Sequence, residues 1–138
     1  MKILLTKKFS FEMAHALDGY DGKCANLHGH SYHLDVTVEG APAGEDGISL
    51  DFHTIKELVQ RIVVDRFDHA LVLREGSDLI AQHSSLNIPN LVALPFNPTT
   101  ENLLLHFAEL IAPALPAGAR LHSLRLSETD TSTAELIL

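Results

Sequence analysis

The stretch His28-Gly29-His30-Ser31-Tyr32-His33-Leu34-Asp35-Val36-Thr37-Val38 alternates between two kinds of side chain. From Tyr32 onward every second residue is apolar or aromatic, and the residues between are polar or charged. Successive side chains of a strand point to opposite faces, so His28 and His30 share the face that carries the apolar residues. The pattern predicts a strand over about Ser31 to Glu39, with its histidines directed toward the protein interior.

A second strand of the same kind is predicted from Ile3 to Ala14. The residues in phase on its apolar face are Phe9, Phe11, Met13 and His15. This third imidazole therefore points toward the same interior as the other two. Neutral imidazole is a preferred zinc ligand, and a catalytic zinc site typically takes three protein ligands and keeps one open position. We therefore expect His15, His28 and His30 to bind one zinc ion.

Cys24 is the only cysteine of the chain, and three residues separate it from His28. Beside a metal ion, a thiol can act as a nucleophile or as a base. Alternatively, Cys24 supplies a fourth ligand and closes a structural zinc site, or it is simply a small buried apolar residue. The residues alone leave these three interpretations open.

One helix is predicted after a turn-rich segment. Thr54 with Glu57 forms a candidate capping box, and the helix is expected to end near Arg66. Its apolar residues recur at helical spacing: Ile55, Leu58, Val59, Ile62, Val63 and Phe67. The segment from Leu73 to Pro98 is expected to be irregular, with a short helix near Asp78 to His83, because its prolines break any longer element.

A second helix is predicted from Thr100 to Ala112, with Thr99 as its N-cap. A hairpin follows, with strands at Leu121 to Ser127 and Thr133 to Leu138. The order is then strand, strand, helix, helix, strand, strand, without βαβ alternation. We therefore predict an α+β fold in which a four-stranded antiparallel sheet carries both helices on one face.

Two further features place carboxylates where they can take part in chemistry. Asp68 and His69 follow the first helix and could form an acid–base pair, or they could lie at a solvated helix end. Glu128 shares one face of a strand with Leu124 and Leu126, and burial of a carboxylate requires a partner. Its two oxygens match the paired N–H donors of a pterin or guanine edge. A glutamate at a hairpin turn is the alternative.

The run Asn97 to Asn102 begins the second helix, where the first backbone N–H groups have no partner within the helix. The free N–H groups around Thr99 and Thr100 favour a ligand rich in hydrogen-bond acceptors. Capping of the helix explains the same residues equally well.

Composition limits the class of protein. A chain of 138 residues, 46% of them hydrophobic, suffices for one domain, residues 1–138, with a substantial core. The net charge of −8 argues against a nucleic-acid partner, which requires basic patches. No apolar stretch is long enough to cross a bilayer, and a lone cysteine forms no internal disulfide. We therefore expect a soluble cytoplasmic protein with no membrane partner.

Six motifs, in this order, resemble those of one family, the pterin-processing synthases of the tunnelling (T) fold, which include 6-pyruvoyltetrahydropterin synthase and 6-carboxytetrahydropterin synthase. The motifs are Phe11–His15, Cys24–Tyr32, Leu50–Phe52, Phe67–His69, Asn97–Asn102 and Ser127–Thr129. The resemblance covers nearly the whole chain. It implies a T fold that oligomerises into a barrel, a hexamer of two trimers, with active sites at subunit interfaces.

The same resemblance implies roles for individual residues. The three histidines would bind zinc, and Cys24 would transfer protons together with Asp68 and His69. Glu128 would anchor the pterin ring of a triphosphate-bearing substrate. These roles are implied by the family and are not worked out from spacing.

The spacing of Cys24 from the His-Gly-His motif resembles that of the carboxy-type enzymes of queuosine (7-deazaguanine) biosynthesis, whereas the animal pyruvoyl-type enzymes carry a longer gap. The resemblance therefore favours a zinc-dependent lyase, 6-carboxy-5,6,7,8-tetrahydropterin synthase. Such an enzyme converts 7,8-dihydroneopterin triphosphate to 6-carboxytetrahydropterin, acetaldehyde and triphosphate. The alternatives are 6-pyruvoyltetrahydropterin synthase, which eliminates triphosphate, and a non-catalytic zinc-stabilised assembly module.

Overall fold

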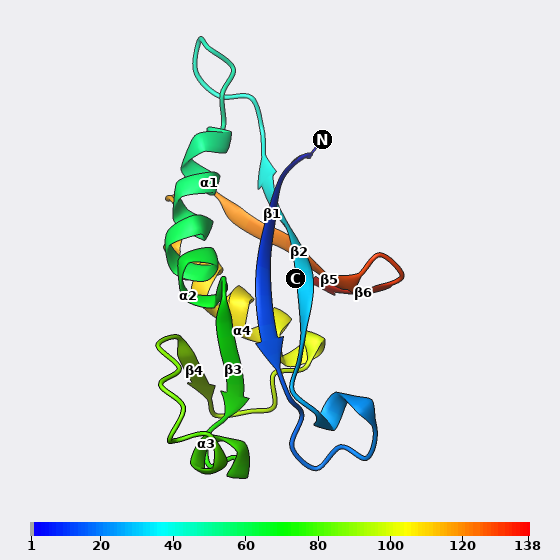
Figure 1. The fold of residues 1–138 in the computed structure, drawn as a ribbon. Coiled ribbons are helices and arrows are strands. Elements are labelled where there is room, and N and C mark those ends of the chain that lie inside the picture. Colours follow the sequence, from blue (N-terminus) through cyan, green and yellow to red (C-terminus); the bar gives the residue numbers. More distant parts are fainter. Residues whose placement is uncertain (1) are drawn as a thin grey trace.

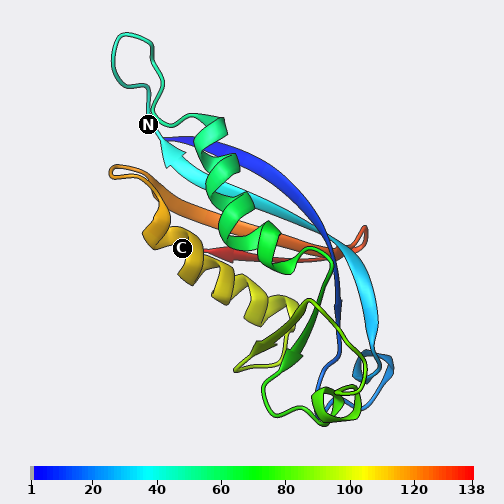
Figure 2. The ribbon, with the colours of Figure 1, turned by 60° about the vertical axis from the view of Figure 1, so that its left-hand side comes forward.

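The computed structural model describes residues 2–138. A curled six-stranded sheet carries its two longest helical segments on one face (Figures 1 and 2). The strands lie in the order β4-β3-β1-β2-β5-β6. Their bounds are β1 Ile3–His15, β2 His28–Gly40, β3 Ala70–Arg74, β4 Leu91–Leu94, β5 Arg120–Thr129 and β6 Ser132–Ile137.

The helices confirm most of the predicted helical segments. Their bounds are α1 Phe52–Val59, a π-helical turn Gln60–Val64, α2 Asp65–Phe67, α3 Asp78–Gln82 and α4 Thr100–Ile111, with 3-10 turns at Lys23–Ala25 and Ala112–Ala114. The segment from α1 through α2 is continuous and ends one residue beyond Arg66. The Thr99 side chain caps α4 by accepting from the Asn102 amide at 3.2 Å, as predicted.

The predicted capping box of α1 is wrong. The Asp51 side chain accepts a hydrogen bond from the His53 amide at 2.9 Å, so the helix begins at Phe52 and not after Thr54. A carboxylate oxygen placed two residues before an N–H satisfies one of the free donors of the first turn. Thr54 therefore lies inside the helix, where no cap is needed.

The predicted strand count and the wholly antiparallel pairing are also wrong. β4 lies inside the region expected to be irregular, β3 overlaps the start of that region, and β3 pairs parallel with both β1 and β4. The prolines flank β4 and do not interrupt it, because Pro89 precedes Leu91 and Pro95 follows Leu94. The α+β class and the placement of both main helices on one face are confirmed.

The long strand pair β1 and β2 positions the aromatic core residues and the histidines. These strands run antiparallel, with Phe11 opposite Tyr32, Met13 opposite His30 and His15 opposite His28. The rings of Phe11 and Tyr32 stack with centroids 5.3 Å apart under the helices. The apolar face predicted from the alternation is thus the core face, and it ends in imidazoles. Across residues 2–138, no helix is both long and apolar enough to span a bilayer.

His106 of α4 lies in an aromatic cluster at the edge of this core. Its ring centroid is 5.5 Å from that of Phe96 and 6.1 Å from that of Phe67. Within the described chain, its buried Nε2 has no hydrogen-bond partner. Burial lowers the pKa of His106, the charge of Arg66 lowers it further, and Glu109 acts in the opposite direction.

This shift predicts a loss of stability in mild acid. The unfolded chain takes up a proton on His106 near the ordinary pKa of 6.5, whereas the folded protein keeps the ring neutral to lower pH. The unfolded state then binds more protons, so the stability present above pH 6.5 falls as the pH drops through the folded pKa. His106→Leu should reduce the difference in unfolding free energy between about pH 7.5 and about pH 5.5.

Urea unfolding of both proteins at the two pH values measures this difference. The pKa of His15 is lowered by burial too, but His15 is present in both proteins, so its contribution cancels in the comparison. An unchanged pH dependence in His106→Leu would contradict the prediction.

Candidate functional site

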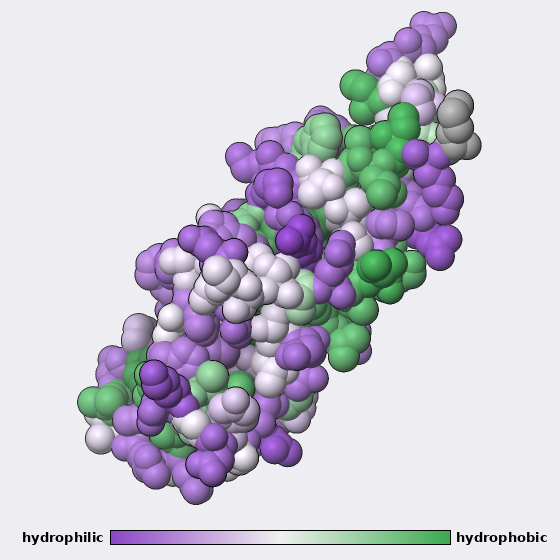
Figure 3. Space-filling model, turned by 90° about the vertical axis from the view of Figure 1, so that its right-hand side faces the viewer, coloured by the Kyte–Doolittle hydropathy of each residue, from purple (hydrophilic) through white to green (hydrophobic). Residues whose placement is uncertain are grey.

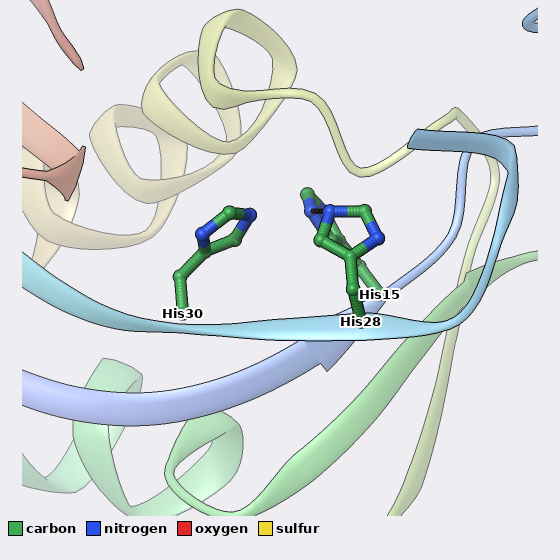
Figure 4. A group of neighbouring side chains, drawn as sticks. All are labelled: His15, His28 and His30. Carbon is green, nitrogen blue, oxygen red and sulfur yellow. Dashed lines mark hydrogen bonds between the residues drawn. The ribbon is translucent and has the colours of Figure 1, made fainter. Parts of the chain in front are cut away.

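Three histidines meet where β1 ends beside the start of β2. Because His15 lies opposite His28 and Met13 opposite His30, all three imidazoles rise from the core face at one end of the strand pair. Their candidate ligand nitrogens lie within 4.8 Å of one another, and the Nε2 atoms of His15 and His28 are 3.0 Å apart. Figure 4 shows the rings of His28 and His30 standing on β2 beside that of His15.

Hydrogen bonds to backbone carbonyls orient two of these rings for binding a cation. His15 Nδ1 lies 2.8 Å from the carbonyl oxygen of Pro98, and His28 Nδ1 lies 2.7 Å from that of Asn26. A carbonyl oxygen only accepts, so each Nδ1 carries a proton, and in the neutral ring Nε2 then presents a lone pair. A backbone carbonyl that holds the far ring nitrogen is the usual partner of a histidine that binds a metal.

The ring of His30 and the lowered pKa of His15 also agree with a metal-binding role. The Nε2 of His30 is buried and has no hydrogen-bond partner in the described part of the chain. Burial lowers the pKa of His15, and its two histidine neighbours add to the effect, while the Pro98 carbonyl and the Glu128 carboxylate oppose it. A neutral ring is the form that binds a metal, so the three residues fit a divalent cation such as zinc.

Glu128 and Cys24 lie near the same cluster. Burial raises the pKa of Tyr32, and the charge of Glu128, a hydrogen bond to Glu128 and the charge of Cys24 raise it further. Glu128 also acts on His15 through its charge. The half-buried Glu128 sits where the pairing of β5 with β6 shifts register, between Ser127 and Thr129. These effects on Tyr32 and His15 place the Glu128 carboxylate at the end of the sheet that carries the three histidines.

Cys24 lies in the 3-10 turn between β1 and β2 and is half buried. Its carbonyl accepts from the Leu17 amide at 2.9 Å, which closes the base of this loop. Among residues 2–138, the group of side chains close enough to share a metal contains the three histidines and not Cys24. The thiol is near enough to act on Tyr32 through its charge but lies outside the group that could share a cation, which favours the catalytic interpretation of Cys24 over a fourth ligand.

Asp68 and His69 form a pair, but at a different place. His69 Nδ1 lies 3.0 Å from Asp68 Oδ2, and the Glu12 amide donates to Asp68 Oδ1 at 2.9 Å. The bond from Glu12 lowers the pKa of Asp68, and the bond from His69 lowers it further. The His69 amide in turn donates to the Glu12 carbonyl at 2.6 Å, with His69 at a φ of 60°.

This pair belongs to the opposite face of the sheet. His69 precedes Ala70, which pairs with Met13, so His69 lies level with Glu12, whose side chain alternates away from the core. The His69 side chain is 78% exposed and borders an open cavity of about 470 Å³, whose lining also includes Glu12, His30 and Asn90. Within residues 2–138, His69 lies outside the group of histidines whose nitrogens are close enough to share a cation.

Three groups that help to form the candidate site were not identified from the sequence: the Tyr32 side chain, the Pro98 carbonyl and the Asn97 side chain. Tyr32 showed an inward phase, but nothing in the pattern indicated its contact with Glu128. The Pro98 carbonyl and the Asn97 side chain lie far from His15 along the chain, and a backbone acceptor leaves no signature in a sequence.

Thr99 caps α4 and Thr100 is its first residue, so both lie beside the Pro98 carbonyl.

Together, the curled sheet with helices on one face and the convergent histidines define a tunnelling-fold protein with a candidate metal centre. The chain belongs to the 6-pyruvoyl tetrahydropterin synthase family, whose family model matches residues 4–137. This finding confirms the resemblance inferred from the six motifs.

Relatives and solved structures agree with this assignment. The chain is 36% identical over 140 residues to a Haemophilus influenzae protein named 6-carboxy-5,6,7,8-tetrahydropterin synthase, covering 95% of this chain and 96% of that one. It is 34% identical to a Rickettsia bellii protein of the same name, with 97% and 99% covered. An uncharacterized Wolinella succinogenes protein, 18% identical, shares the fold with a TM-score of 0.84 over 99% and 98% of the two chains. The 6-pyruvoyl tetrahydropterin synthase of Caenorhabditis elegans, 19% identical, does so with a TM-score of 0.74 over 100% and 96%.

Proposed function

We propose that this chain is a cytoplasmic, zinc-dependent 6-carboxy-5,6,7,8-tetrahydropterin synthase acting in queuosine biosynthesis. It converts 7,8-dihydroneopterin triphosphate and water to 6-carboxytetrahydropterin, acetaldehyde and triphosphate. The observation that carries the proposal is the convergence of three imidazoles near Cys24 and Glu128. The names of the relatives and the three-residue gap between Cys24 and His28 support the carboxy-type product.

Each residue of the site has a role in this reaction. A zinc ion held by the three histidines would polarise the oxygens of the substrate side chain. Glu128 accepts the paired N–H donors of the pterin edge and so fixes the orientation of the ring. Cys24 takes a proton from the substrate side chain, and His69, held by Asp68, transfers another. The helix start at Thr99 and Thr100 receives acceptor-rich parts of the substrate.

The proposed roles of Asp68 and His69 require a second copy of the chain. Because this pair lies on the face opposite the histidines, His69 of one subunit reaches the site of a neighbour in the proposed hexamer of two trimers. Apolar side chains interrupt the hydrophilic surface on the face drawn in Figure 3. Exposed apolar residues at the sheet ends include Ile3, Leu4 and Ile137, which supports assembly through the sheet.

Light scattering tests the assembly directly. The expected result is an active species larger than a dimer, because each site needs groups from more than one chain. A stable and fully active monomer would contradict interface-built sites while leaving zinc binding untouched.

Product analysis tests the reaction. Incubation of the zinc-loaded protein with 7,8-dihydroneopterin triphosphate should release acetaldehyde and 6-carboxytetrahydropterin, detected by mass spectrometry. A 6-pyruvoyl product that keeps the side-chain carbons would assign the chain to the triphosphate-eliminating activity instead. Absence of turnover in a zinc-loaded assembly would favour the non-catalytic module.

Glu128→Gln should weaken pterin binding about tenfold to a hundredfold. The amide keeps the shape of the side chain but removes the charge and replaces one acceptor with a donor, so the paired contact to the ring edge is lost. A hydrogen bond to a charged group contributes about 1.5–3 kcal/mol. Titration of a pterin analogue into the variant measures the effect.

Glu135→Gln is the matched control, because Glu135 is exposed on β6. Its affinity for the analogue should equal that of the parent protein, and both variants should keep their zinc. Parent-like affinity in Glu128→Gln would show that the ring is held by other groups.

A further inference from the structure

Asn97 joins two parts of the site that are far apart in sequence. Its side-chain Oδ1 accepts from the Asp18 amide at 3.0 Å, and its Nδ2 donates to the Asp18 carbonyl at 2.8 Å. Both backbone groups of Asp18 are therefore satisfied by one side chain. Such a two-point contact sets the direction of the chain as well as its distance.

The first part held in this way is the loop that carries Cys24. Asp18 is the neighbour of Leu17, whose amide donates to the Cys24 carbonyl. On its other side, the Asp18 carboxylate accepts from the Ser77 hydroxyl at 2.8 Å, which links the loop to the start of α3. The position of Cys24 relative to the core thus depends on where Asn97 holds Asp18.

The second part is the carbonyl that orients a histidine. Pro98 follows Asn97 directly, is buried, and its carbonyl accepts the Nδ1 proton of His15. The Asn97 carbonyl is itself held by the Thr99 amide at 2.8 Å and the Asn102 side chain at 3.0 Å. The Asn97–Pro98 peptide therefore has little freedom, and it transmits the geometry of the α4 start to the His15 ring.

We propose that Asn97 is a positioning residue that fixes the position of the His15 ring relative to the Cys24 loop. This inference rests on the proposed function and deepens it. In the described part of the chain, the Asn97 side chain hydrogen-bonds to Asp18 and to neither the histidines nor the thiol. It acts through the Pro98 carbonyl on one side and through Asp18 on the other, and a site of this kind tolerates only small displacements of its groups.

Asn97→Ser is the test variant, because a short hydroxyl cannot span both backbone groups of Asp18. Asn87→Ser is the matched control, since Asn87 is exposed in the loop before β4. Zinc affinity is measured by chelator competition, and the ligand geometry by the visible absorption of the cobalt-substituted protein. Neither readout depends on turnover.

The expected result is a folded Asn97→Ser protein whose zinc affinity is reduced about tenfold, the lower end of the range for changes to groups that orient a metal ligand. Its cobalt spectrum should differ from that of the parent, and its kcat should fall more than its KM rises, because positioning matters most in the transition state. Asn87→Ser should match the parent in every measurement. If Asn97→Ser does not fold, Asn97→Asp, which keeps the acceptor and loses the donor, is compared with Asn87→Asp in the same way.

The outcomes separate this inference from the function on which it rests. A parent protein that binds zinc and turns over substrate, with a folded Asn97→Ser variant of equal affinity, spectrum and kcat, overturns the role of Asn97 alone. A parent protein that binds no zinc overturns the proposed function together with it.

Discussion

His30→Ala should lose nearly all of its zinc and, with it, turnover. The buried Nε2 of His30 has no hydrogen-bond partner in the described chain, and a bound metal would supply one. Removing one of three protein ligands should reduce zinc affinity by more than the roughly 10–100-fold lost when a group that hydrogen-bonds to a ligand is removed. Elemental analysis after gel filtration measures the zinc remaining per chain.

His33→Ala is the matched control for this change. His33 is on the same strand but alternates to the opposite, exposed face, so its removal subtracts an imidazole without touching the cluster. This variant should keep its zinc. Circular dichroism and thermal unfolding show whether His30→Ala remains folded, and a folded His30→Ala protein with full zinc content would refute the three-histidine site.

Cys24→Ala should retain zinc but turn over about 10²–10⁴-fold more slowly. The size of the loss is that typical of removing a positioned acid or base. Cys24 lies beside the histidine cluster and outside the group that can share a cation within residues 2–138, so the metal should stay bound. Zinc content and kcat are measured on the same preparation.

This variant distinguishes the catalytic role of Cys24 from the structural one. Loss of zinc in Cys24→Ala would identify the thiol as a fourth ligand and favour a structural site. Turnover equal to that of the parent would show that another group moves the proton. Binding of a pterin analogue should be unchanged, because Glu128 is intact.

Much of the site could be predicted because strand alternation is a local property. The phase of Phe11, Met13 and His15 and the phase of His30 and Tyr32 each follow from a repeat of two residues, and the register of β1 with β2 joins them. The cap at Thr99 was equally visible, because a helix start depends on a few adjacent residues. These features needed no knowledge of distant parts of the chain.

The strands β3 and β4 were missed because parallel pairing depends on distant partners. The two strands are only five and four residues long, and only the edge of β1 and the crossover through α1 and α2 make them strands. Short apolar runs carry no periodicity that separates a strand from a loop. The cap at Asp51 was missed for a simpler reason, since Thr54 offered a competing capping pattern in the same turn.

Strand alternation along the chain was enough to predict that one face of a strand pair ends in three imidazoles, and the motifs indicated the family. Which ring nitrogens are free depends on the folded chain, because the Pro98 and Asn26 carbonyls that orient the rings of His15 and His28 come from the backbone. The tertiary structure also decided that Asp68 and His69 lie on the face opposite the histidines, since that follows from the parallel pairing of β3 with β1. Alternation along a strand is encoded in neighbouring residues, whereas hydrogen bonds between segments 83 residues apart exist only once the chain has folded.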